Sequence, residues 1–165
     1  MTLNTSLLTS ACILMCSSVF AATPTPNALL DDWRILDSRS GVIESVMHFE
    51  QEKDGSYSGT VIKSSPNPLI RLYETCMKCP APFTDKPIVG MKVLWGFTQD
   101  AKDSNRFNDG YAFDPKNGKT YKAKIRISGD QRRMMLRGYI GTPIIGRTEV
   151  WLRGDGNLTQ RLDSK

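Results

Sequence analysis

Apolar and polar residues alternate most regularly over residues 121–128. Four apolar side chains would share one face of this stretch: Tyr121, Ala123, Ile125 and Ile127. The positions between them and after them are basic or polar: Lys122, Lys124, Arg126 and Ser128. A period of two is typical of a strand with one face in a core and the other in water. Asn117 and Gly118 before it, and Gly129 and Asp130 after it, predict tight turns to antiparallel neighbours.

The same alternation predicts strands elsewhere in the chain. Residues 43–50 carry one face of Ile43, Ser45, Met47 and Phe49, and residues 57–63 return as the partner strand after a turn at Asp54 and Gly55. Residues 89–97 are predicted to place on one face Met91, Val93, Trp95 and Phe97. Residues 99–108 are polar and predict a loop. Tyr111 and Phe113 then alternate in a further strand.

Turn dipeptides separate about eight short strands at 54–55, 109–110, 117–118, 129–130 and 155–156. Such spacing predicts an all-β fold, a single antiparallel up-and-down β-barrel of lipocalin type. Asn27 is predicted to cap a short N-terminal helical turn that covers one end, with Leu29, Leu30 and Trp33 on its buried face. An eight-stranded barrel holds either one small ligand or a filled core.

Residues 1–21 are predicted to be a signal peptide. Residues 7–20 form a charge-free apolar run, and small residues at Ala21 and Ala22 suit a cleavage site. A spanning helix is less favoured because the run is shorter than the roughly 20 residues that a bilayer requires. Lipid attachment at Cys12 or Cys16 is also less favoured. Residues 22–165 are then one domain, periplasmic or secreted, and soluble after cleavage.

Only Cys76 and Cys79 survive this cleavage, in a proline-rich irregular segment over residues 64–87. In an oxidising compartment two thiols so close are expected to pair, stabilising the fold by about 2 kcal/mol. A redox pair is an alternative, but it requires a helix start within a βαβ unit. A zinc site requires four ligands, and His48 is the sole histidine. Unpaired thiols are the remaining alternative.

Several motifs together resemble an exported bacterial family of unknown function, DUF2147. They are the early Trp33, the Cys76 and Cys79 pair, residues 86–90, residues 114–121, residues 137–141 and residues 146–151. The resemblance covers nearly the whole mature chain. It implies one exported domain and supplies no activity. Asp31 stands where the family usually has the glycine of a Gly-x-Trp sequence, which is also found in lipocalin strands.

We interpret the motif residues as architecture: Trp33, Asp114, Pro115, Gly118, Gly138, Gly141, Gly146, Arg147 and Trp151. Asp114 to Gly118 suit a turn, the later glycines suit strand bends, and Arg147 and Trp151 point to one face of a strand and are candidates to stack. No nucleophile elbow, phosphate loop or histidine pair is present. The sequence therefore predicts no catalytic residue, metal ion or cofactor.

Charge is concentrated late in the chain. Residues 116–153 hold ten Lys or Arg against Asp130 and Glu149, so 10 − 2 gives +8, compared with +5 for the whole chain. This is either a solvated exterior that protects sheet edges or a surface for anionic lipid or lipopolysaccharide. Export disfavours nucleic acid as a partner. The oligomeric state is not predicted.

Three hypotheses follow. The favoured one is a non-catalytic envelope module that binds a small lipophilic ligand inside the barrel, with candidate lining residues Met47, Phe49, Trp95, Phe97, Tyr111, Phe113, Tyr121 and Tyr139. The second is a structural or protein-interaction module with a filled core. The third is an enzyme or thiol-redox protein that uses Cys76 and Cys79.

Overall fold

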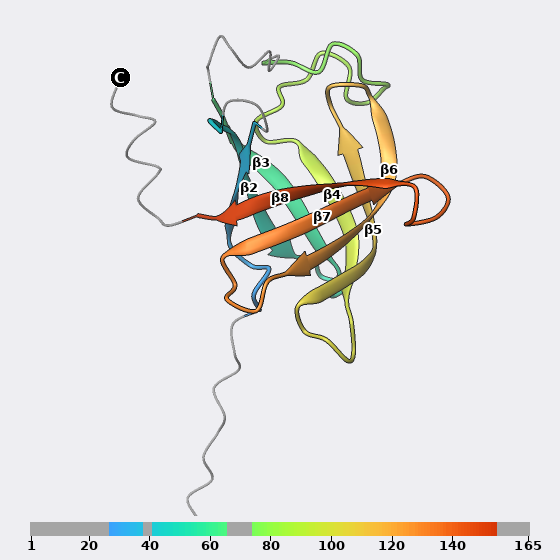
Figure 1. Ribbon diagram of the computed structural model, residues 1–165. Helices are drawn as coiled ribbons and strands as arrows, with labels where there is room; N and C mark the ends of the chain where they lie inside the picture. Colours follow the sequence, from blue (N-terminus) through green and yellow to red (C-terminus); the bar gives the residue numbers. More distant parts are fainter. Residues whose placement is uncertain (1–26, 38–40, 66–73, 155–165) are drawn as a thin grey trace, which may run out of the picture.

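A computed structural model of the protein describes residues 27–37, 41–65 and 74–154, which form a closed barrel of eight antiparallel strands (Figure 1). The strands are β1 (Asp32–Leu36), β2 (Ile43–Gln51), β3 (Tyr57–Ser64), β4 (Lys92–Gln99), β5 (Arg106–Asp114), β6 (Lys119–Ile127), β7 (Arg133–Tyr139) and β8 (Gly146–Arg153). Each strand pairs with the next, and β8 returns to β1. The predicted fold class is confirmed. The predicted signal peptide and the turn at 155–156 lie outside the described residues.

The alternation of β6 sets the inner and outer faces. Ala123, Ile125 and Ile127 are buried, whereas Lys122 and Arg126 are exposed. Residues paired across antiparallel strands point to the same face. Ile125 pairs with Phe107 on one side and with Leu136 on the other, and all three are buried. The core is therefore the inside of the barrel, built from alternate residues of each strand.

Asp109 and Gly110 do not form the predicted turn between strands. They lie within β5, which already begins at Arg106, and Asp109 takes a positive φ of 60° where the pairing with β6 shifts register. An aspartate tolerates this conformation in a β-bulge as it does in a turn. The predicted loop over residues 99–108 is therefore shorter, and Phe107 becomes a fully buried core residue.

Residues 27–31 cover one end of the barrel. The Asn27 side chain accepts a hydrogen bond from the Leu29 backbone N–H, so Asn27 caps a single turn that leads directly into β1. Leu29 and Trp33 are fully buried, while Leu30 is 42% exposed. The Trp33 ring lies under the Arg153 guanidinium, 4.7 Å away, and donates a hydrogen bond to the Leu29 carbonyl. We call this end of the barrel the packed end.

Residues 74–91, between β3 and β4, fold against the turn that joins β5 to β6. A disulfide links Cys76 and Cys79, and both cysteines are buried. The segment approaches the β5–β6 turn so closely that residue 118 must be glycine, since a Cβ there would lie 2.3 Å from the Lys78 carbonyl oxygen. Among the described residues no helix is long and apolar enough to cross a membrane.

Candidate functional site

The end of the barrel opposite residues 27–31 has a less buried interior, and we call it the open end. Its inner positions are Ile35 on β1, Ala112 on β5, Tyr121 on β6 and Gly138 on β7. Ala112 pairs with Tyr121, and Gly138 pairs with the buried Ala123, so these residues face inward. All four are half-buried, whereas the inner residues below them are buried. Solvent therefore reaches the interior from this end.

The packing inside the barrel differs around two inward-facing glycines, Gly110 and Gly138. A Cβ added at Gly110 would lie 2.3 Å from the Phe97 ring, far inside van der Waals contact. At Gly138 the nearest atom to such a Cβ would be the Tyr121 Cβ, at 3.8 Å, an ordinary contact distance. A side chain therefore cannot replace the hydrogen of Gly110 without displacing Phe97, whereas Gly138 has room for at least a methyl group.

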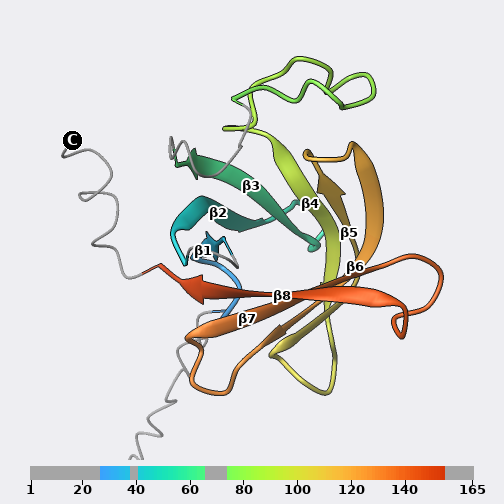
Figure 2. The same cartoon turned by 45° about the horizontal axis from the view of Figure 1, so that its top comes forward.

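Between β1 and β8, strand pairing is short and stops before the open end. The two strands pair only at Trp33 with Arg153 and at Arg34 with Leu152. Within the described residues, the earlier part of β8 pairs with β7 alone, and residues 146–150 are all exposed. The β7–β8 hairpin therefore extends past the seam (Figure 2).

Charged side chains surround the open end. Lys116, in the turn after β5, forms a salt bridge with Glu44 of β2, whose carboxylate is buried. Because β2 and β5 are not neighbours in the barrel, this pair connects distant parts of the wall. Arg147 lies on the face of β8 that carries Trp151, with Glu149 between them and 3.9 Å from the Arg147 Nε. The rim of the open end therefore carries two cationic side chains, Lys116 and Arg147, each paired with a glutamate, next to an apolar and aromatic interior.

The predicted ligand-lining residues separate into an inner and an outer group. Met47, Phe49 and Phe97 are core residues, 0–2% exposed, and contribute to the packed interior. Tyr121 is the one member of the predicted set at the half-buried inner positions of the open end, where its hydroxyl accepts a hydrogen bond from Asn117. Ala112 was not predicted because the aromatic residues on either side of it, Tyr111 and Phe113, were expected to face inward in its place. Ile35 was not predicted because no strand was expected around it.

Trp95, Tyr111, Phe113 and Tyr139 lie on the outer face. Trp95 pairs and stacks with Tyr111, and Tyr111 and Tyr139 each pair with Lys122, which faces solvent. The prediction that Trp95 and Phe97 share a face is wrong, because Gly96 takes a φ of 73° and reverses the alternation.

Phe113 is buried from outside the wall. It pairs with the exposed Thr120 and stacks on Phe83 of the 74–91 segment, with ring centroids 5.1 Å apart. A residue with a core-like exposure of 5% therefore does not line the barrel interior.

The motif residues lie in turns and at strand ends. The Asp114 carboxylate accepts hydrogen bonds from the backbone N–H of Lys116 and from the Asn117 side chain, and the Pro115 carbonyl faces Cys76 Sγ at 3.6 Å. Gly118 and Gly141 take positive φ angles, and Gly146 begins β8.

The arginine over a tryptophan is Arg153 over Trp33, at the packed end. Arg147 instead is paired with Glu149, which also accepts a hydrogen bond from the Trp151 ring. This arrangement was not predicted because Arg153 and Trp33 are 120 positions apart in sequence, so no local pattern relates them.

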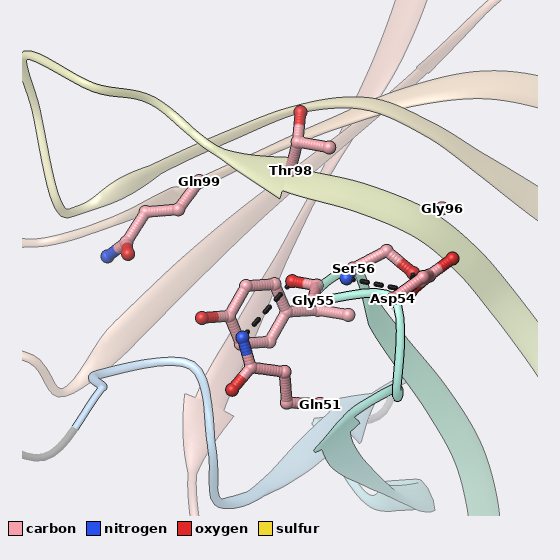
Figure 3. A pocket seen from close by; sticks show the side chains of 8 residues that line it. Gln51, Asp54, Gly55, Ser56, Gly96, Thr98 and Gln99 are labelled. Carbon is pink, nitrogen blue, oxygen red and sulfur yellow. Dashed lines mark hydrogen bonds between the residues drawn. The ribbon is translucent and has the colours of Figure 1, made fainter.

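A surface hollow of about 590 Å³ lies between the β2–β3 turn and β4 (Figure 3). It is lined by Gln51, Asp54, Gly55, Ser56, Tyr57, Gly96, Thr98 and Gln99. Its polar side chains are hydrogen-bonded: Gln51 donates to the Gly55 carbonyl, Ser56 donates to Asp54, and Gln99 donates to the Ser104 carbonyl outside the hollow. These hydrogen bonds from Ser56 hold the pKa of Asp54 below its ordinary value. An anionic, internally satisfied hollow does not suit a lipophilic ligand.

Comparisons with known proteins agree with the barrel geometry. The model of a family described as an uncharacterized protein conserved in bacteria (DUF2147) matches residues 32–153. The solved structure of HP1028 from Helicobacter pylori, described as belonging to the lipocalin family, is similar with a TM-score of 0.66. At 16% identity the similarity covers 83% of this chain and 90% of that one, and it concerns the fold. Among curated proteins none matches the chain.

Proposed function

This chain belongs to the DUF2147 family, and we propose that it is a non-catalytic binding module of the bacterial cell envelope for a small lipophilic or anionic lipid-like ligand. The observation that carries the proposal is the looser packing of the inner positions of the open end: they are half-buried, and a Cβ at Gly138 would meet no close atom, whereas one at Gly110 would overlap Phe97. The proposed ligand site is the open end.

The proposed occupant is an amphiphile, because the open end combines two kinds of surface. Ile35, Ala112 and Tyr121 offer an apolar and aromatic inner wall to a hydrocarbon chain. Lys116 and Arg147 at the rim offer charge-assisted hydrogen bonds to an anionic head group. A ligand with its chain inward and its head at the rim satisfies both.

The packing limits how deeply such a ligand enters. Phe97 and Phe107 are fully buried, and Tyr57 packs edge-to-face on Phe107 with ring centroids 5.2 Å apart. Burying a chain among them would require core side chains to move, which costs free energy in a close-packed interior. A short chain or the end of a longer one is therefore the expected guest.

The absence of catalysis is part of the proposal. His48, the sole histidine, is half-exposed on β2 and lies 2.7 Å from the Asp32 carboxylate. Cys76 and Cys79 are joined in a disulfide and buried against the β5–β6 turn. His48 is exposed on the strand surface, and the disulfide leaves no free thiol at Cys76 or Cys79, although both lie beside the β5–β6 turn at the open end.

The first test is native mass spectrometry of the protein purified from its own cell envelope, before and after organic extraction. We expect an extractable lipophile of defined mass. The extracted protein is then loaded with a hydrophobic dye and titrated with fatty acids. Gly138→Leu should weaken dye binding by at least about tenfold, because the leucine occupies the space for the ligand.

The matched control is Val150→Leu, which adds a methylene group to an exposed side chain of the adjacent strand and should leave dye binding unchanged. Arg147→Gln should weaken a fatty acid by about tenfold and the corresponding alcohol much less. If Gly138→Leu binds the dye as well as the natural chain does, the site is not in the barrel. A filled-core interaction module then becomes the better hypothesis.

A further inference from the structure

The connection between β7 and β8 presents three isoleucines to solvent. Ile140, Ile144 and Ile145 are 68%, 87% and 76% exposed. They stand at the end of the hairpin that projects from the barrel (Figures 1 and 2). Single exposed apolar residues are common on protein surfaces, but three in one short connection form a patch typical of an interaction site. We call residues 140–145 the hairpin tip.

Hydrogen bonds from Arg137 hold the hairpin tip in one conformation. Its Nε donates to the Pro143 carbonyl at 2.6 Å, its Nη2 to the Ile144 carbonyl at 3.1 Å, and its Nη1 to the Thr148 hydroxyl at 2.9 Å. The Ile145 backbone N–H also donates to the Thr142 carbonyl. The isoleucines are therefore displayed by a bonded loop, which lowers the entropy that a contact would cost.

The surroundings of the hairpin tip are basic. Arg137 and Arg147 flank the hairpin tip, and residues 131–148 contain no aspartate or glutamate. On the neighbouring strand Lys122 pairs with Tyr139, and Lys124 pairs with Arg137, so two lysines adjoin the hairpin from β6. An apolar projection with a cationic border matches the interface of a bilayer, where acyl chains lie beneath anionic head groups.

We propose that the hairpin tip docks on an anionic phospholipid bilayer, with Ile144 and Ile145 entering the head-group region and the basic residues of β6 and β7 facing the phosphates. This is a membrane contact made by the outside of the barrel. It adjoins the proposed ligand site at the open end, where Arg147 borders both, but it does not depend on a bound ligand.

Charge favours a bilayer over a second copy of this chain. A symmetric contact through the hairpin tip would bring the arginines of both copies together, and like charges at an interface repel. Among the described residues, the first part of β8 pairs with β7 alone and is exposed, so self-association through this strand is an outcome that the experiment must detect.

The experiment is flotation with vesicles of phosphatidylcholine alone or of equal parts phosphatidylcholine and phosphatidylglycerol. The natural chain and each variant carry the same N-terminus, so any contribution of the predicted signal peptide is common to them. We expect the natural chain to bind the anionic vesicles, and less so at high salt. The double variant Ile144→Ser, Ile145→Ser should bind at least about tenfold more weakly.

Leu30→Ser is the control, because Leu30 is an exposed apolar residue at the packed end. It should bind vesicles as the natural chain does. Equal vesicle binding by the natural chain and the double variant would overturn the proposal. So would the finding that the natural chain forms a salt-sensitive dimer and that the double variant does not, because the isoleucines would then bind a second copy of the chain. Gly138→Leu should leave flotation unchanged, so failure of the ligand proposal and failure of the membrane proposal are distinguishable.

Discussion

The two ends of this barrel differ in how their interiors are filled. In the middle of the barrel Phe97 packs against Gly110, and at the packed end Trp33 lies beneath Arg153, with each of these aromatic side chains fully buried. At the open end the inner positions hold smaller or half-buried residues such as Ala112 and Gly138. The seam between β1 and β8 also ends before the open end is reached.

This difference separates stability from function within one fold. Close packing and fixed hydrogen bonds make the packed end the expected source of most of the free energy of unfolding. The open end leaves polar rim groups and inner space that contribute little to that free energy. Substitutions of the same chemical kind should therefore have unequal effects at the two ends.

The sharpest test compares Gly110→Ala with Gly138→Ala. Neither glycine has a positive φ, so the added methyl group is the main change. At Gly110 it would overlap the Phe97 ring and should lower the free energy of unfolding by about 3 kcal/mol. At Gly138 it meets no close atom and should leave stability equal or raise it by up to about 1 kcal/mol. Urea denaturation measures both.

The companion variant Phe97→Ala locates the cause. Alone it should cost about 3–5 kcal/mol, because it leaves a cavity in the core. Combined with Gly110→Ala it should cost less than the sum of the two, because the methyl group then fills part of that cavity. Additive effects would show that Gly110 is needed for some reason other than the Phe97 ring, and the packing comparison would fail.

The strands and the barrel could be predicted from the sequence, but which residues line the barrel interior could not. Strict alternation at β6 correctly predicted a half-buried strand because its period continues unbroken for eight residues. Asp109 and Gly110 look like turn residues, and Gly96 looks like an ordinary strand position, yet in the structure the backbone at both places has positive φ angles and is irregular within a strand. A bulge reverses which residues face inward, so the predicted ligand-lining set contained outer residues.

Arg153 and Arg147 provide the next comparison, since both belong to β8. Arg153 donates to the Gln131 and Ala28 carbonyls at 2.6 Å each, pairs with Asp31 and covers Trp33. Arg153→Gln should lower the free energy of unfolding by about 2 kcal/mol, because these groups lose a shared cationic partner. Thermal unfolding followed by circular dichroism measures the loss.

Arg147→Gln is the matched control. Its side chain is 80% exposed, and within the described residues it forms an ion pair with Glu149, 3.9 Å away. Exposed ion pairs of this length contribute little, so its free energy of unfolding should change by no more than about 0.5 kcal/mol. Equal losses of unfolding free energy in the two variants would mean that the contacts of Arg153 at the packed end stabilise the fold no more than the exposed ion pair of Arg147 does.

The disulfide tests the attachment of residues 74–91. The double variant Cys76→Ser, Cys79→Ser should lower the free energy of unfolding by up to about 2 kcal/mol, the chain-entropy value for so short a loop. Hydrogen exchange should rise first at the Cys76 amide, which donates to the Lys86 carbonyl within this segment. Strand β7, at a distance from the segment in the strand order, should keep its protection. A loss of protection in both would make the segment part of the barrel's main folding unit.

The smallest expected effect is a pH dependence at the irregular junction of β3 and β4, where pairing is limited to Tyr57 with Phe97, Gly59 with Leu94 and Thr60 with Lys92. Hydrogen bonds from Lys92 and then from Ser58 hold the pKa of Glu52 below its ordinary value. A lowered folded-state pKa contributes stability that is present above the unfolded pKa and is lost as the pH falls through the folded pKa.

Glu52→Gln should therefore lower the melting temperature slightly at neutral pH, and the difference should disappear in acid. Glu50→Gln, which removes a longer 3.6 Å pair with Lys92, should have less effect. If the Glu52→Gln difference persists unchanged into acid, the contact acts through packing and not through charge.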